Sequence, residues 1–449
     1  MSSRKVVARL PVETGRSGWE AISTRGFAPR ELLGDIRADW LIIGAGFAGL
    51  SAARRLLQLC PGDRVVVLDA LQVAQGPAGR NSGYMIDVPH NLSSGEYSSD
   101  DARATELEIA QNRFAIDFAK SAAAEYGMDR NTFDPSGKIN AAATPRGMQA
   151  NARFAASLKG IGEAHELLDA KALRELTGSD YYLGGLRTPG AVLIQPADYI
   201  RSFAQGLHQK VELYENSPVL SLESEGSSWR ARTPQGSVSA PKVILGVNGH
   251  LQSFGFGKGR LMHVFTYASM TAGIRLADFS RNALGAERWA LLPADPMGAT
   301  MRKITHRGEG RIVTRTRFTY DPSMEVSQAR VDAIAAEQRQ SFDARFPELR
   351  GVRMEYSWAG RLCLTRNSVS VFGEIEKGLY SACVENGLGT VKSTLAGVLA
   401  VDLANGVPAP HLKALLNQPK PGLLPPEPIG WLGANAVIRW QELRAGRES

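Results

Sequence analysis

The stretch DWLIIGAGFAGLSAARRLLQLC at residues 39–60, followed by PGDRVVVLDA at residues 61–70, decides the fold of this chain. Residues 40–43 are wholly apolar and run into glycine, as expected of a short strand that is buried on both faces. Residues 47–60 then place Phe47, Leu50, Leu56 and Leu57 at helical spacing among small alanines. A turn and a second apolar run at residues 65–68 follow. The order of strand, tight turn, helix and strand predicts a βαβ unit.

Gly44, Gly46 and Gly49 form a GxGxxG pattern between the first strand and the helix. In this context the first glycine makes the tight turn, the second admits a pyrophosphate, and the third lets the helix pack closely. The phosphates would lie at the helix N-terminus, where free N–H groups favour anions. Asp69 ends the second strand, where an acid binds ribose hydroxyls and disfavours an NADP-type 2′-phosphate. The pattern predicts a dinucleotide site and leaves NAD and FAD both open.

The composition excludes several classes of protein. The chain has 449 residues, which predicts two domains or one α/β unit with an inserted domain. The net charge of +7 is scattered rather than concentrated, so we expect no nucleic-acid partner. No apolar run reaches the ~20 residues of a membrane span, and the N-terminus lacks an apolar signal region. With three cysteines, which argue for a reducing compartment, we expect a cytoplasmic protein with no membrane partner.

Motifs of other chemistries are missing from the sequence. The seven histidines show no metal-ligand spacing such as HxxxH, and there is no CxxC, P-loop or GxSxG pattern. The sequence therefore predicts no metal site.

The segment GPAGRNSGYMIDVPH at residues 76–90 favours FAD over NAD. A simple NAD dehydrogenase would continue with another βα unit here, whereas this chain enters a loop broken by glycines. With GAGFAGLSAARRL, VVVLDA and AGRNSG, the chain resembles FAD-dependent oxidoreductases of the D-amino acid oxidase superfamily, in its γ-glutamylputrescine oxidase-like branch. IQPADY at 194–199, VILGVNG at 243–249, WAG at 358–360 and ENGLGT at 385–390 agree with this resemblance.

The resemblance implies an α/β fold, α+β overall, with a Rossmann-like FAD-binding domain and a discontinuous substrate domain on a mixed or antiparallel sheet with helices. We expect the FAD-binding domain at residues 37–89, 194–250 and 355–412, and the substrate-binding domain at 90–193 and 251–354. Residues 1–36 are expected to form an N-terminal extension and residues 413–449 a proline-rich tail.

The same resemblance implies which residues contact FAD. Glycines allow close approach to the cofactor, while amides, an arginine and hydroxyls satisfy phosphate and ring acceptors. The helix that begins at the GLGT turn would stabilise negative charge on the reduced ring. The expected contacts are Gly44, Gly46, Phe47, Ala48, Gly49, Asp69, Ala70, Gly79, Arg80, Asn81, Ser82, Gly83, Val219, Gly360, Gly387, Leu388, Gly389 and Thr390.

Candidate substrate-side residues come from segments that line the pocket in relatives. Arg302 would clamp a carboxylate because its fork suits that geometry, and Lys303 would help oxygen react, as a lysine does in sarcosine oxidases. His90, His263 and Tyr267 are further candidates; surface exposure or ordinary packing is the alternative for all five. Cys363 lies near the position where sarcosine oxidases attach flavin, but the register is offset to Gly360. We therefore expect a buried structural cysteine and a non-covalent FAD.

Three functions remain open at this point. The first is an FAD-dependent amine or amino-acid oxidase, which converts a C–N bond to an imine and O₂ to H₂O₂. The second is a dehydrogenase that passes the electrons to a quinone or a protein. The third, suggested only by the positive charge, is a flavin-bearing RNA-modifying protein. The expected partners of the first are a small amine or amino acid and O₂.

Overall fold

The predicted βαβ unit lies in the middle of a six-stranded sheet in the computed structural model, which describes residues 4–449 apart from 27, 90–98 and 276–284. The sheet order is β11 (Glu212–Tyr214), β4 (Val65–Leu68), β3 (Trp40–Ile43), β15 (Lys242–Leu245), β22 (Leu379–Cys383) and β21 (Val371–Glu376). The first five strands are parallel and β21 is antiparallel. Helix α2 (Phe47–Leu59) connects β3 to β4, which confirms the predicted unit.

Both faces of this sheet are buried, which explains its continuous apolar strands. Ile42 and Val67 pack toward α2 and α9 (Gly389–Ala404), whereas Leu41 and Val66 pack toward a second sheet. That five-stranded sheet has the order β1 (Arg4–Val6), β12 (Ser221–Glu225), β13 (Ser228–Arg232), β14 (Gly236–Ala240) and β2 (Gly34–Arg37). The N-terminal segment therefore supplies two strands, β1 and β2, rather than a separate extension.

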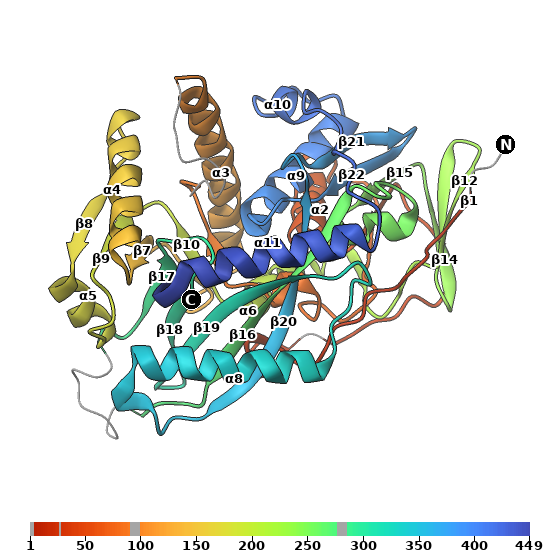
Figure 1. The fold of residues 1–449 in the computed structure, drawn as a ribbon. Helices are drawn as coiled ribbons and strands as arrows, with labels where there is room; N and C mark the ends of the chain where they lie inside the picture. The colour runs from red at the N-terminus through yellow and green to blue at the C-terminus, as the bar shows by residue number, and fades with distance from the viewer. Residues whose placement is uncertain (1–3, 27, 90–98, 276–284) are drawn as a thin grey trace.

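The third large sheet has eight strands and carries the other half of the molecule (Figure 1). Its order is β20 (Met354–Thr365), β16 (Leu261–Thr271), β19 (Glu309–Tyr320), β18 (Thr300–His306), β17 (Trp289–Pro293), β7 (Lys138–Ala142), β9 (Gly184–Thr188) and β8 (Glu166–Asp169). Trp358, Met270 and Val313 share a core with Ile42 of the six-stranded sheet. The opposite face packs against α5 (Ala170–Thr177) and α8 (Gln328–Arg345). One face of the eight-stranded sheet therefore looks toward the nucleotide-binding part.

A small sheet and further helices complete the described part of the fold. A three-stranded sheet has the order β5 (Tyr84–Met85), β10 (Val192–Ile194) and β6 (Phe133–Asp134). The remaining helices are α1 (Gly18–Ala21), α3 (Ser99–Glu125), α4 (Pro145–Gly160), α6 (Pro196–Leu207), α10 (Leu412–Leu416) and α11 (Ile429–Ala445), with short 3₁₀ turns at Pro77–Gly79, Asn248–Phe254, Pro347–Leu349 and Gly446–Glu448. Among the described residues, no helix is both long and apolar enough to cross a bilayer.

Strand β20 links the two halves of the molecule. It pairs antiparallel with β16 from Thr365 to Met354, so residues 354–365 belong to the eight-stranded sheet by hydrogen bonding. The expected domain division had placed this range with the FAD-binding segments. From Val371 onward the chain returns to the six-stranded sheet and then to α9, which contacts α2.

Candidate active site

The GxGxxG turn has the geometry that a pyrophosphate site requires. Gly44 has φ +104°, and a Cβ there would lie 2.6 Å from the carbonyl oxygen of Gly246. A Cβ on Gly49 would lie 1.8 Å from the carbonyl oxygen of Gly44. At Gly46, by contrast, a Cβ would meet only Ala78 at 3.5 Å. The first and third glycines are thus fixed by packing, and the second leaves the N-terminus of α2 open to an anion.

Asp69 closes the same turn. Its Oδ2 accepts from the amide of Ala45 at 2.7 Å, and its Oδ1 accepts from the amide of Leu71 at 2.9 Å. Burial raises the pKa of Asp69, while these backbone donors oppose the rise. Each carboxylate oxygen keeps a second lone pair, so the group can still accept from ribose hydroxyls. Ala70 adjoins it, and Val219 is buried in the core between the six- and five-stranded sheets.

The loop at residues 76–85 is held through its backbone carbonyls by side chains from four other elements. Trp19 Nε1 donates to the carbonyl of Asn81 at 2.9 Å, and Trp358 Nε1 donates to that of Arg80 at 3.0 Å. The remaining donors are Arg302 to Gly83 at 3.2 Å, Thr390 to Tyr84 at 2.6 Å and Ser17 to Gly79 at 3.3 Å. No described residue accepts from the amides of Asn81 and Ser82. The loop is fixed by its acceptors and keeps two donors for a ligand.

Arg80 points away from the loop's free amides. Its Nε donates to the carbonyl of Ala359 at 2.8 Å, and its Nη atoms donate to Gly15 at 2.9 Å and Thr14 at 2.7 Å. The guanidinium therefore joins the N-terminal segment to β20 and is buried. A cofactor contact at Arg80 would involve its backbone, while the side chain sets the position of the loop.

Asn81 also shapes the loop through its side chain. Its Nδ2 donates to the carbonyl of Ala78 at 2.7 Å, and its Oδ1 accepts from the amide of Gly83 at 2.8 Å. Gly83 has φ +79°, and a Cβ there would lie 2.4 Å from the carbonyl oxygen of Ile194. Asn81 and Gly83 thus build the turn, and the side chain of Ser82 is half-buried beside it.

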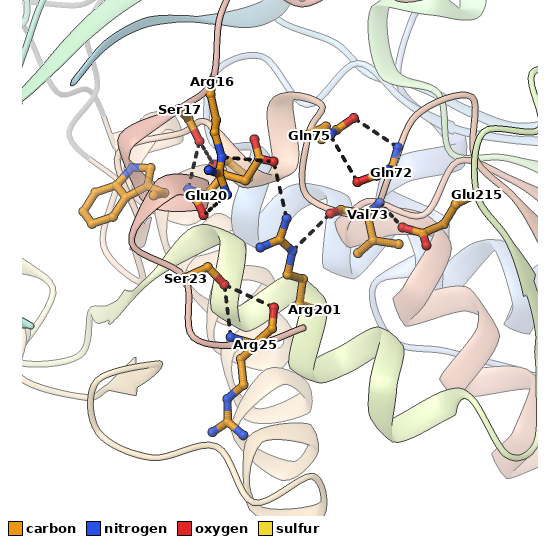
Figure 2. A network of polar contacts seen from close by, with 12 residues as sticks. Arg16, Ser17, Glu20, Ser23, Arg25, Gln72, Val73, Gln75, Arg201 and Glu215 are labelled. Atoms are coloured by element: carbon orange, nitrogen blue, oxygen red, sulfur yellow. Dashed lines mark hydrogen bonds and ion pairs between the residues drawn. The ribbon is translucent and has the colours of Figure 1, made fainter. Parts of the chain in front are cut away.

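The N-terminal segment that bears Trp19 is itself braced against the approach to this loop (Figure 2). Ser17 caps α1 by accepting from the amide of Glu20 at 3.1 Å. Arg201 of α6 lies 3.6 Å from the Glu20 carboxylate and donates to the carbonyl of Val73 at 3.4 Å. Glu215 accepts from the Val73 amide. Residues 16–25 and 72–75 therefore form one bonded unit with α6.

The start of α9 meets the loop from the other side. Gly387 has φ +90°, and Leu388 precedes the first turn, which begins at Gly389 and Thr390. A Cβ on Gly360 of β20 would lie 3.1 Å from the carbonyl oxygen of Arg80, so β20 passes directly against the loop. The expected contacts at residues 79–83, 360 and 387–390 are therefore brought together in space.

Two acceptors of this region have no donor among the described residues. Asn248 Nδ2 donates to Glu385 Oε1 at 2.6 Å, which leaves Asn248 Oδ1 and Glu385 Oε2 buried without a partner. Burial raises the pKa of Glu385 to about 7. Val384, a buried β-branched residue, has φ +64°, which marks local strain at the end of β22. FAD carries ribityl hydroxyls and a ring N–H, so its donors fit these acceptors.

Four of the five substrate-side candidates lie among the described residues, and the structure does not bring all four of them together. Adjacent positions on a strand face opposite sides, and Arg302 lies on the side of Trp19, at 5.4 Å from its ring. Burial lowers the pKa of Arg302 to about 10. Lys303 Nζ donates to the carbonyl of Ala286 at 2.9 Å, and burial lowers its pKa to about 8.

Tyr267 packs toward α8, and its hydroxyl lies 2.6 Å from Thr319 Oγ1. His263 is buried beside Gly249 and Cys363. His90 lies outside the described residues. The roles proposed for these side chains stay predictions.

Several residues that build the site were missed by sequence reasoning. Trp19 and Ser17 lie in the segment expected to be an extension, and no local motif identified them. Trp358 was recognised only as part of the WAG resemblance, and Asn248 and Glu385 only as parts of quoted segments. Their roles depend on pairings between residues 62 to 278 positions apart, which a single sequence does not display.

The fold and the site define a flavin-type dinucleotide-binding oxidoreductase. Residues 39–403 match the family described as "DAO: FAD dependent oxidoreductase", and the chain belongs to that family. FAD is therefore its cofactor.

Named relatives agree at lower similarity. The chain is 25% identical over 418 residues to the "Gamma-glutamylputrescine oxidoreductase" of Escherichia coli (strain K12), covering 90% of this chain and 92% of that protein. It is 25% identical to the "Probable oxidoreductase OrdL" of Haemophilus influenzae over 82% of this chain and 83% of the relative. The solved glycine oxidase from Geobacillus kaustophilus has a TM-score of 0.70 and 19% identity, covering 86% of this chain and all of that one. The last comparison confirms the predicted fold class.

Proposed function

We propose that this FAD-dependent oxidoreductase is an oxidase of an amine or amino acid. The observation that carries the cofactor part of the proposal is the loop at 79–83. Other elements donate to every carbonyl of this loop except that of Ser82, and the Asn81 and Ser82 amides have no acceptor among the described residues. FAD, when bound, accepts a hydride from the carbon next to a substrate nitrogen. The imine product is hydrolysed by water, and O₂ takes the electrons to give H₂O₂. The γ-glutamylputrescine oxidoreductase relative supports an amine substrate.

The chain's own residues bind and orient the cofactor in this proposal. The N-terminus of α2 and the glycine turn hold the pyrophosphate, Asp69 holds the ribose, and the backbone at Val219 meets the adenine. With FAD bound, the N-terminus of α9 would stabilise negative charge on the flavin ring, because the unpaired amides of the first turn point out from the N-terminal end of the helix. The FAD is held without a covalent bond, because Cys363 is buried and its pKa lies well above the usual range for a thiol.

Proton transfer needs no dedicated acid–base pair if the substrate amine arrives neutral.

We place the protein in the cytoplasm, because Cys60, Cys363 and Cys383 form no disulfide and free thiols persist in that compartment. Arg302 and Lys303 remain candidates for substrate recognition and oxygen reaction.

A panel of amines and amino acids tests the proposal. We expect one class to bleach the flavin absorbance anaerobically, and air to restore it with one H₂O₂ formed per substrate oxidised. Bleaching without peroxide, with turnover restored by a quinone, would show a dehydrogenase instead. A flavin that no amine or amino acid reduces would refute the substrate class.

A further inference from the structure

The C-terminal helix α11 is attached to the molecule through polar side chains. Asn435 accepts from the amide of Tyr320 and donates to its carbonyl, both at 3.0 Å. Glu442 accepts from the amide of Phe318 at 2.9 Å and pairs with Arg317 at 2.5 Å. The hydrogen bonds and the ion pair that join α11 to β19 are therefore made by polar side chains. An ordinary surface helix packs instead through a buried apolar side.

The opposite side of α11 is apolar and exposed. Ile429, Leu432, Ala436, Trp440 and Leu443 recur at steps of three, four, four and three residues, which places them on one line along a helix. We call this line the outer stripe. The exposed fractions are 64% for Ile429, 57% for Leu432, 58% for Trp440 and 66% for Leu443. Figure 1 shows α11 on the outside of the molecule, crossing in front of the eight-stranded sheet. A contiguous exposed apolar line of this kind marks an interaction surface.

Basic residues border the outer stripe on both sides. At 3.6 residues per turn, Arg439 falls at one edge of the stripe and Arg444 at the other. The guanidinium of Arg444 lies 5.2 Å from the centre of the Trp440 ring. Arg439 lies 3.3 Å from Glu442, but that carboxylate is buried and is shared with Arg317. Since Glu442 is the sole acid in the sequence of α11, the exposed rim of the stripe is positively charged.

We propose that the outer stripe docks this protein on the surface of an anionic lipid bilayer. The tryptophan and aliphatic side chains would enter the boundary between headgroups and acyl chains, and the flanking arginines would contact lipid phosphates. Exposed tryptophan and aliphatic side chains with arginines beside them are groups by which helices that lie in the membrane plane contact a bilayer. Charge favours this occupant over a second copy of the chain, because the chain carries +7 overall and the rim of α11 offers the arginines no exposed acid.

This proposal is independent of the FAD chemistry. It also differs from the expectation of no membrane partner, which rested on the lack of a spanning segment. A length criterion of ~20 apolar residues detects helices that cross a bilayer but does not detect helices that lie on its surface.

Vesicle co-sedimentation of the full-length, FAD-loaded protein tests the proposal. We expect binding to phosphatidylcholine vesicles that contain phosphatidylglycerol, little binding to phosphatidylcholine alone, and weaker binding at high salt. The double variant Leu432→Gln with Leu443→Gln should bind about tenfold more weakly. The matched control is Leu33→Gln with Leu167→Gln, which changes two leucines of 68% and 62% exposure elsewhere.

Flavin content and thermal unfolding should be the same in both double variants, because neither pair of leucines is in the core. The proposal is overturned if the protein ignores anionic vesicles, or if both double variants bind as the wild type does. It is also overturned if the protein is a dimer without lipid, which the α11 variant alone converts to monomer. In that case the outer stripe is an interface between two copies of the chain.

Discussion

Replacing Trp19 with phenylalanine tests whether the N-terminal segment positions the loop at residues 76–85, the flavin loop of our proposal. Trp19 is fully buried, and its Nε1 donates to the carbonyl of Asn81 at 2.9 Å. Phenylalanine keeps an aromatic ring against Trp358 and Arg302 but removes the donor. The bond is part-buried, and it is the only one that a described residue donates to this carbonyl; leaving such a group without a donor costs roughly 1–3 kcal/mol, with the low end expected where water can reach it.

That cost divides between folding and cofactor binding. If the loop keeps its position without FAD, the whole loss appears as reduced stability of the apoprotein. If the loop of the apoprotein instead moves so that the Asn81 carbonyl can bond to water, FAD binding must restore the original position of the loop. The binding free energy then loses up to the same 1–3 kcal/mol, which weakens FAD affinity by about 5- to 150-fold. Because the Asn81 and Ser82 amides that the loop offers to FAD flank this carbonyl, we expect the second case, with about tenfold weaker FAD binding.

The measurement is a fluorescence titration of the apoprotein with FAD, alongside thermal unfolding with and without FAD. Trp229→Phe is the matched control. Trp229 lies in the five-stranded sheet, and its buried indole donates to the carbonyl of Lys377 at 3.0 Å. It should lower stability and leave FAD affinity within twofold. Equal losses of FAD affinity in both variants, or a Trp19→Phe variant with unchanged affinity, would refute the reasoning.

Three further predictions concern the glycine turn, the buried acid and the cofactor linkage. Gly49→Ala places a Cβ 1.8 Å from a backbone oxygen and should destabilise even the apoprotein, which thermal unfolding measures. Gly46→Ala should fold normally but lose FAD, which the flavin content of the purified protein measures. Glu385, with its pKa raised by burial to about 7, binds a proton more tightly in the folded apoprotein than in the unfolded chain. Glu385 should therefore lower the free energy of unfolding as pH rises from about 4.5 to 7, and Glu385→Gln should remove that contribution and make the slope shallower in urea titrations. Acid precipitation should release all flavin from both the wild type and Cys363→Ala; flavin retained by the wild-type pellet would show a covalent bond.

The nucleotide-binding unit was predictable because its determinants are local. A fully buried parallel strand must be apolar along its length, a pyrophosphate turn needs glycines at fixed spacing, and the ribose acid must end the next strand. All of these lie within residues 39–70. The loop at 76–85 was also found locally, through its glycines and the Arg80-Asn81-Ser82 sequence.

The role of individual side chains in that loop was not predictable. Arg80 appeared to be a phosphate ligand, yet its guanidinium joins residues 14–15 to β20. The neighbours Arg302 and Lys303 were both predicted to lie on the substrate side, but strand alternation separates their contacts: Arg302 donates to Gly83 and Ile194, and Lys303 donates to Ala286. Deciding which face meets the cofactor requires the register of the eight-stranded sheet.

The sequence by itself therefore predicted a dinucleotide and the place where its phosphates would bind, since short-range backbone geometry dictates both; the choice of FAD rested on the family resemblance, and the family match confirms it. Only the tertiary structure decided what holds the flavin loop, because Trp19, Trp358 and Thr390 reach it from 62 to 306 residues away. It also decided that α11 is joined to β19 by polar side chains. The apolar spacing of that helix is visible in the sequence, but whether an apolar stripe is buried or exposed depends on what packs against it.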